Sequence, residues 1–206
     1  GKTMIIAWLA GYGPEPGDSE AQAQLRRLRE QVTGFHFCLA NSRNLSPQAF
    51  AERIANQLTA KVSGFGAALT AILAERVQIT QQVGTAQPGA IITAIGRLDL
   101  STLGDELSFD RAFTQPVKKL YESGYDKPLL LLVDSLDVAQ TYTGQTNLVQ
   151  LLAKLDDLPT QVRILMTTRP DPRVLMNYRE ARKFDLVINA PPDSDDVRRY
   201  VAGRLK

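Results

Sequence analysis

Apolar residues along the chain fall into two kinds of segment, which predict strands separated by helices. Short apolar runs without alternation predict buried strands, expected at 35–40, 129–133, 162–167 and 184–188. Longer segments with an apolar residue at every third or fourth position predict amphipathic helices, expected at 3–10, 19–32, 46–62, 67–76, 108–123 and 146–155, and from 193 onwards. Because buried strands alternate with helices, the pattern indicates an α/β fold with a mostly parallel sheet flanked by helices.

One region, residues 77–100, departs from this alternation. Two segments rich in β-branched residues, 77–83 and 90–95, flank a turn that contains Pro88 and Gly89. This arrangement predicts a small β-hairpin inserted into the α/β pattern. Two roles are open for it: a surface hairpin that covers a sheet edge, or an element that contacts a partner.

The composition is that of an ordinary globular chain of 206 residues, with 44% hydrophobic residues, 22% charged residues and a net charge of +2. The densest basic cluster, at 26–29, is typical of a solvated helix face, so the sequence gives no direct sign of nucleic-acid binding. It contains neither an apolar stretch of about 18 residues nor a signal-peptide pattern. We therefore expect no membrane segment and a cytoplasmic location.

The single cysteine and the single histidine lie close together in an apolar segment. Cys38 cannot form an intramolecular disulfide, and a small buried residue is its expected role. His36 has no second histidine or neighbouring ligand with which to share a metal, and we expect it to be structural. These counts argue against a hydrolase built on a Ser-His-Asp or Cys-His arrangement.

The first three residues, Gly1, Lys2 and Thr3, match the end of the phosphate-binding loop Gly-x-x-x-x-Gly-Lys-[Ser/Thr]. In such a loop, backbone N–H groups and the lysine hold phosphates, and the hydroxyl reaches Mg²⁺. A helix directly after the loop adds a favourable dipole. The first glycine of the pattern is not in the chain, so we expect a fragment that begins inside its own phosphate loop.

Polar residues also follow two of the predicted strands. Asp134 ends the apolar run LLLLVD and is expected to hold Mg²⁺ through a water molecule. Asp137 could orient an attacking water, and Arg169 could reach the γ-phosphate. Each residue alone could equally be an ordinary loop residue. Because parallel strands gather their carboxyl ends at one edge, the order and spacing of these residues favour a single site.

These motifs, together with Met166-Thr-Thr-Arg169-Pro170 and the small residue Ser135, resemble the STAND class of signalling NTPases, most closely its NACHT branch. Phe35-His-Phe-Cys38, and Pro191-Pro192 before a helix with Tyr200, are also similar to NACHT sequences. The resemblance implies a three-layer P-loop NTPase fold and a regulatory switch that binds ATP or GTP with Mg²⁺. It also implies protein partners through self-assembly and through flanking effector and repeat-sensor domains.

On this resemblance, residues 1–190 form the nucleotide-binding domain and 191–206 begin a helical lid domain. In this family the strand before the phosphate loop lies between the strands ending at Thr167 and near Ile188. We therefore expect both strands to have an unpaired edge, and the 206-residue chain to be less stable than one extended at its N-terminus.

The residue after Asp137 leaves two functions open. Many NACHT proteins have glutamate there, whereas this chain has Val138, so we expect slow hydrolysis. The first function is a signalling switch with weak NTPase activity. The alternative is a non-catalytic oligomerisation or scaffold module that retains the NTPase fold.

Overall fold

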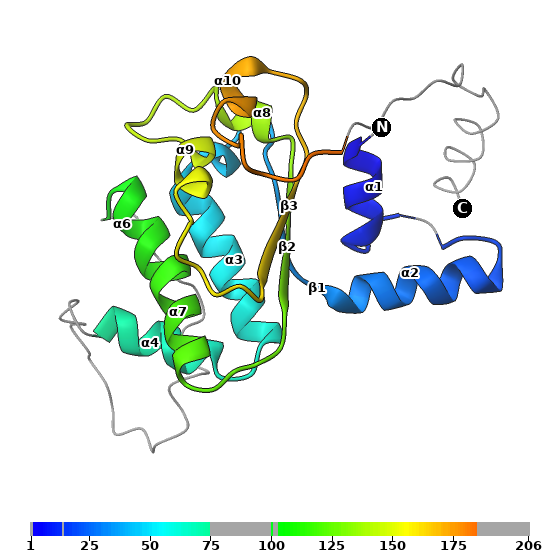
Figure 1. Cartoon of the computed structure of the whole chain (residues 1–206), viewed down its shortest axis with the longest axis horizontal. Coiled ribbons are helices and arrows are strands. Elements are labelled where there is room, and N and C mark those ends of the chain that lie inside the picture. The colour runs from blue at the N-terminus through cyan, green and yellow to red at the C-terminus, as the bar shows by residue number, and fades with distance from the viewer. Residues whose placement is uncertain (1, 14, 75–99, 101–102, 185–206) are drawn as a thin grey trace.

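The computed structural model describes residues 2–13, 15–74, 100 and 103–184 and has a mixed α/β architecture. Its sheet has three parallel strands in the order β1 (Val32–Phe37), β2 (Leu129–Asp134) and β3 (Val162–Met166). The register aligns Phe37 with Asp134 and Val133 with Met166, so all three strands end at the same edge. Helices flank the sheet on both faces, as the sequence pattern predicts (Figure 1).

One face of the sheet carries the main hydrophobic core. Its helices are α3 (Pro47–Lys61), α4 (Phe65–Ala74), α6 (Asp105–Phe109), α7 (Gln115–Glu122) and α9 (Leu148–Ala153). Leu129, Leu131 and Val133 of β2 point into this core, whereas Leu130 and Leu132 point to the opposite face. An apolar strand of this kind is stable only when both of its faces are covered.

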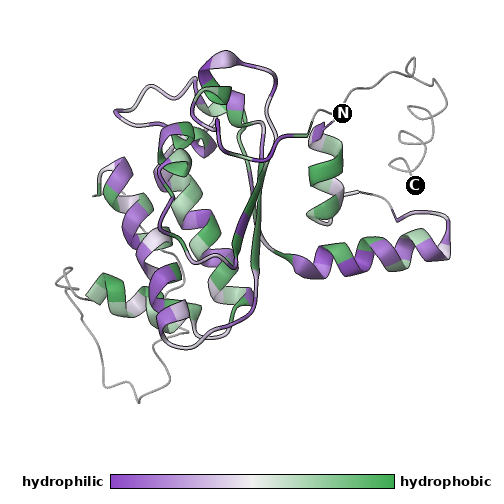
Figure 2. Ribbon diagram, in the orientation of Figure 1, coloured by the Kyte–Doolittle hydropathy of each residue, from purple (hydrophilic) through white to green (hydrophobic). Residues whose placement is uncertain are grey.

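The opposite face is covered by α1 (Lys2–Leu9), which packs through Ile6 against Val32 and Leu132. The polar helix α2 (Ser19–Gln31) follows α1, and Figure 2 shows the contrast between the two helices. On this face Leu165 of β3 is 43% exposed, so the cover extends over β1 and β2 more fully than over β3.

The two outer edges of the sheet differ. Along β1, the side-chain amide of Gln57 donates to the carbonyl oxygen of Phe35 at 2.8 Å and accepts from its N–H at 3.0 Å. Within the described residues, no strand pairs with the outer edge of β3. An unpaired edge was expected for the strand ending at Thr167. It was also expected for the strand at 184–188, whose residues 185–188 lie outside the described part.

Strand β1 begins earlier than expected, at Val32 rather than at Phe35. The sequence suggested that Gly34 precedes the strand, but Gly34 lies inside it. A Cβ atom at Gly34 would lie 3.0 Å from Leu131 Cδ2 and 3.3 Å from Ile54 Cδ1. The glycine therefore permits a close approach of α3 and β2 to this strand.

Most of the predicted helices are present with small differences at their ends. Ser46 caps α3 by accepting the Ala49 N–H at 3.1 Å, and Pro47 occupies the first turn. The helix expected at 108–123 begins at Asp105 instead. It contains a π-helical turn, η2 (Asp110–Thr114), just before Pro116, so the proline neither starts nor ends the helix. Three short elements were not predicted: η1 (Arg43–Leu45), α8 (Leu136–Ala139) and α10 (Pro172–Leu175).

Two large apolar side chains on α1 and α2 are exposed. Trp8 is 38% exposed, because α1 buries only the narrow face that carries Ile6. Leu28 of α2 is 49% exposed, although its neighbours Leu25 and Val32 are buried.

Of the helices in the described ranges, none combines the length and apolar character that crossing a bilayer requires.

Several predictions lie outside the described residues. They are the hairpin at 77–100, apart from its last residue, the helix from 193 onwards and the lid domain at 191–206. Leu100 is buried, and its N–H donates to Glu52 Oε1 at 3.2 Å. Of the strand expected at 184–188, Phe184 alone is described, and it is exposed and outside any strand.

Candidate functional site

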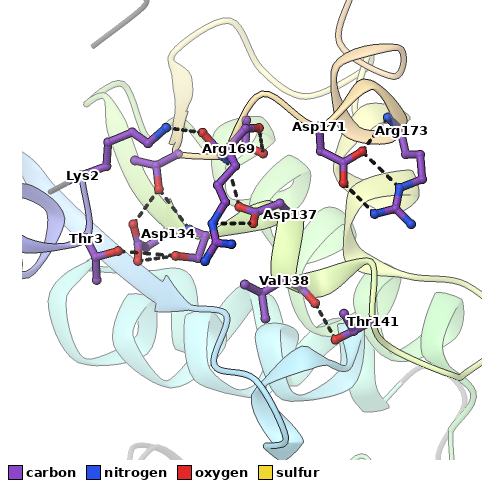
Figure 3. Close-up of polar contacts among 12 residues, drawn as sticks. Lys2, Thr3, Asp134, Asp137, Val138, Thr141, Arg169, Asp171 and Arg173 are labelled. Atoms are coloured by element: carbon purple, nitrogen blue, oxygen red, sulfur yellow. Dashed lines mark hydrogen bonds and ion pairs between the residues drawn. The ribbon is translucent and has the colours of Figure 1, made fainter. Parts of the chain in front are cut away.

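Polar groups from three separate segments meet at the carboxyl edge of the sheet (Figure 3). Lys2 and Thr3 form the first turn of α1, and Asp134 is the last residue of β2. Asp137 lies on α8, and Arg169 follows β3. The structure thus brings these five predicted residues to one edge, and Gly1 lies outside the described residues.

Asp134 is the most buried carboxylate of this group, with 2% of its surface exposed. Its Oδ1 accepts a hydrogen bond from Thr167 Oγ1 at 2.6 Å, and its Oδ2 accepts one from Ser135 Oγ at 2.9 Å. A buried carboxylate is costly unless its oxygens have such partners. The two hydroxyls therefore stabilise Asp134 where it is and fix the direction in which it faces.

The turn after Asp134 is built around Ser135, which has a left-handed backbone conformation with φ 59° and ψ 48°. A non-glycine residue in this region costs about 1 kcal/mol. Two hydrogen bonds offset the cost: the Ser135 N–H donates to Thr167 Oγ1 at 3.0 Å, and the Leu136 N–H donates to the Thr167 carbonyl at 2.8 Å. The turn starts α8 and directs Asp137 back toward Arg169.

Lys2 and Thr3 reach the same edge from the face of the sheet that α1 covers. The Lys2 ammonium donates to the carbonyl oxygen of Thr168 at 2.5 Å. Thr3 Oγ1 lies 3.5 Å from Ser135 Oγ, which itself contacts Asp134. The first turn of α1 contains no acidic residue, so the positive end of the helix is not neutralised by its own side chains.

Asp137 and Arg169 form the outer part of the site. The Arg169 backbone N–H donates to Asp137 Oδ1 at 3.1 Å, and the Arg169 Nε lies 3.5 Å from Oδ2. The Asp137 side chain is 12% exposed, whereas that of Arg169 is 82% exposed. The guanidinium group can therefore turn toward a ligand with little loss of packing.

These groups fit a magnesium ion bound together with phosphates. Within the described ranges, no cluster of three His, Cys, Asp or Glu side chains could hold a metal unaided. Mg²⁺ typically uses only one or two carboxylates and completes its shell with water and phosphate oxygens. One buried carboxylate, Asp134, near the Thr3 hydroxyl is a donor set of that kind.

His36 and Cys38 are structural, as predicted from the sequence. His36 is fully buried, and burial is the main cause that lowers the pKa of its imidazole to about 4. Cys38 is 3% exposed, and burial, with the charges of Asp134 and Asp137, raises the pKa of its thiol to about 12. Burial and a raised pKa both favour the neutral thiol, the form typical of a structural cysteine.

A separate hollow of about 390 Å³ lies between two loops near the site. It is lined by residues of the loop after β1 and the loop after α8: Asn41, Ser42, Arg43, Leu45, Thr141, Tyr142 and Thr143. It contains none of the residues predicted from the sequence. Most of the residues that line it are polar, so it lacks the mostly apolar lining of a typical small-molecule pocket.

Sequence reasoning missed the contribution of Thr167 and Thr168. Thr167 binds Asp134 through its hydroxyl, and Thr168 supplies the carbonyl that contacts Lys2. A usable signal was present: two hydroxyl residues directly follow β3, the strand next to the one that carries Asp134. Comparisons of the chain with protein-family models, with curated proteins and with solved structures found no match.

Proposed function

We propose that the chain is a nucleotide-binding domain that holds Mg-ATP or Mg-GTP at the carboxyl edge of its sheet. On this proposal it is a NACHT-like, STAND-class P-loop NTPase that acts as a signalling switch with slow hydrolysis. The observation that supports it best is the position of the Lys2 ammonium. Within the described residues, its one hydrogen-bond partner is a backbone carbonyl, and no carboxylate neutralises it. A phosphate would supply the missing negative charge.

Each residue has a distinct role in this proposal. Lys2, with the backbone N–H groups at the start of α1, binds the β- and γ-phosphates. Thr3 and Asp134 hold Mg²⁺, the latter through a water molecule. Arg169 contacts the γ-phosphate and responds when that group is lost. The arrangement supports these roles because the start of α1, the end of β2 and the segment after β3 bring these side chains to one edge of the sheet.

Hydrolysis would transfer the γ-phosphoryl group to water, breaking the bond to the β-phosphate oxygen and yielding a nucleoside diphosphate and phosphate. Mg²⁺ supplies charge neutralisation on the phosphates during this step. Asp137 would orient the water and accept its proton, and Arg169 would stabilise the charge that develops. Catalysis of this kind consists mainly of positioning and electrostatics.

One observation favours the alternative, a non-catalytic scaffold that retains the fold. Both oxygens of Asp137 contact Arg169 in this state, so the carboxylate is directed at the arginine rather than at an attacking water. In addition, the residue after Asp137 is Val138, which is partly buried against the main core and supplies no carboxylate. A switch must separate Asp137 from Arg169 when nucleotide binds, whereas a scaffold need not.

The nucleotide state would be passed on to other parts of a multidomain regulator. On the family resemblance, these are an effector domain, a repeat-sensor domain and further copies of the same protein. The exposed guanidinium of Arg169 supports such a coupling, because its position depends on whether Asp137 or a phosphate is its partner.

The proposal is tested by calorimetric titration of the intact protein with ATP and with GTP, each in Mg²⁺ and in excess EDTA. We expect one of the nucleotides to bind and Mg²⁺ to raise its affinity, since Thr3 and Asp134 would contact the metal. Absence of binding by both nucleotides in Mg²⁺ would contradict the proposal.

A further inference from the structure

Thr167 makes four hydrogen bonds to the segment that contains Asp134. Its backbone N–H donates to the Val133 carbonyl at 2.9 Å, and its own carbonyl accepts the Leu136 N–H at 2.8 Å. Its hydroxyl accepts the Ser135 N–H at 3.0 Å and donates to Asp134 Oδ1 at 2.6 Å. The first two bonds need only the backbone, whereas the last two need the hydroxyl group.

The hydroxyl bonds have a fixed direction. An amide N–H can only donate, so the Thr167 oxygen must accept from Ser135 and its proton is left for Asp134. Oδ1 of Asp134 is therefore bound by the Thr167 hydroxyl, whose orientation is fixed by the Ser135 N–H. Within the described part of the chain, Oδ2 accepts only from Ser135 Oγ, which also lies 3.5 Å from Thr3 Oγ1 and can rotate toward it.

The two oxygens of Asp134 thus differ in availability. Oδ1 accepts from the Thr167 hydroxyl, and Oδ2 accepts from Ser135 Oγ, which lies 3.5 Å from the Thr3 hydroxyl in the first turn of α1. Without such partners, the plane of the carboxylate could turn away from Thr3, because the χ2 torsion of aspartate is broad. The Thr167 hydroxyl removes this freedom.

We propose that Thr167 is a positioning residue that turns the Asp134 carboxylate so that Oδ2 faces a divalent cation beside Thr3. This inference rests on the proposed function, since it assumes that the cation binds with a nucleotide at this edge. Groups that orient a metal ligand in this way typically change metal affinity by about 10- to 100-fold when they are removed.

The test is the binding of Mn²⁺, followed by electron paramagnetic resonance, to the intact protein with ATP present. Thr167→Val removes the hydroxyl and keeps the shape and both backbone bonds, and Thr167→Ser restores the hydroxyl. Thr59→Val is a matched control, because the buried Thr59 hydroxyl has no hydrogen-bond partner within the described residues. ATP affinity in excess EDTA is measured for each variant to separate metal binding from nucleotide binding.

We expect Thr167→Val to weaken Mn²⁺ binding at least tenfold, in line with other groups that orient a metal ligand. Thr167→Ser and Thr59→Val should match wild type, and ATP affinity in EDTA should be equal in all four proteins. If Thr167→Val does not fold, Thr167→Ala removes the same hydroxyl without adding a methyl group and is judged by the same criteria.

Two results would overturn the inference while leaving the proposed function intact. One is wild-type Mn²⁺ affinity in Thr167→Val, and the other is equal weakening in Thr167→Val and Thr167→Ser. If wild type binds neither ATP nor GTP in either condition, the proposed function fails, and this inference fails with it.

Discussion

The Asp137 carboxylate is held by Arg169 through two contacts, a backbone N–H at 3.1 Å from Oδ1 and the side-chain Nε at 3.5 Å from Oδ2. The pair links α8, the helix after β2, to the loop after β3. It lies at the same edge of the sheet as Lys2 and Asp134. Because the Arg169 side chain is largely exposed, the ion pair itself contributes at most about 1 kcal/mol. A γ-phosphate could therefore displace Asp137 from the guanidinium at little cost.

Asp137→Asn is expected to abolish single-turnover hydrolysis of Mg-ATP while leaving nucleotide affinity near the wild-type value. The amide keeps the shape of the side chain but cannot accept a proton from the attacking water. Asp171→Asn is a matched control, because Asp171 also accepts a backbone N–H and pairs with an arginine, but its carboxylate contacts Arg173 rather than Arg169. Equal hydrolysis rates in wild type and Asp137→Asn would remove Asp137 from the mechanism.

Val138→Glu is expected to raise the rate of hydrolysis if the missing second carboxylate is what makes turnover slow. Val138 packs against the main core, so the substitution also brings a charge to a partly buried position and should lower stability by about 1–3 kcal/mol. Single-turnover rates should be measured well below the melting temperature of the variant. If wild type, Val138→Glu and Asp137→Asn all hydrolyse no faster than buffer, the scaffold function is favoured.

The free energy of unfolding should fall as the pH is lowered from about 6.5 to about 4. In this range His36 takes up a proton in the unfolded chain but not in the folded one. The imidazole Nε2 lies 2.7 Å from the Asn44 carbonyl, so it carries the proton, and the buried Nδ1 has no partner within the described residues. The folded pKa of about 4 lies below the unperturbed value of 6.5, so the unfolded state takes up the proton first. The stabilisation is therefore present above pH 6.5 and is lost progressively toward pH 4, by about 3 kcal/mol in all.

The measurement for His36 is urea unfolding at several pH values between these limits, for wild type and His36→Gln. Glutamine keeps an N–H donor for the Asn44 carbonyl but does not titrate, so the free energy of unfolding of the variant should depend less on pH. Carboxylates contribute equally to both proteins and cancel in the comparison. The same pH dependence in both proteins would show that His36 is not the group responsible.

The sequence predicted those features of the fold that depend on neighbours along the chain. Ser46 and Pro47 placed the start of α3 correctly, because capping is a local interaction. The apolar run of β2 identified a strand covered on both faces. The start of β1 was placed three residues late, because the reason for Gly34 lies in Leu131 and Ile54, which are distant in sequence.

The residues of the candidate site likewise differ in whether local sequence patterns could identify them. Lys2, Asp134 and Arg169 could be found because each follows a recognisable local pattern, and the rule that parallel strands end at one edge brought them together. Thr167 could not be assigned a role from its neighbours in sequence. Its hydroxyl donates to Asp134 at the end of the neighbouring strand, and only the register of the two strands shows that these residues meet.

The central claim is that Lys2 binds the phosphates of a nucleotide, and calorimetric titration of Mg-nucleotide into the intact Lys2→Ala protein tests it most directly. Lys61→Ala is the matched control, because the Lys61 ammonium also donates to a backbone carbonyl, that of Val32 at 3.2 Å, at the opposite end of the sheet. We predict that Lys2→Ala weakens binding at least tenfold, or about 1.4 kcal/mol, and that Lys61→Ala does not. Equal affinity in wild type and Lys2→Ala would contradict the account.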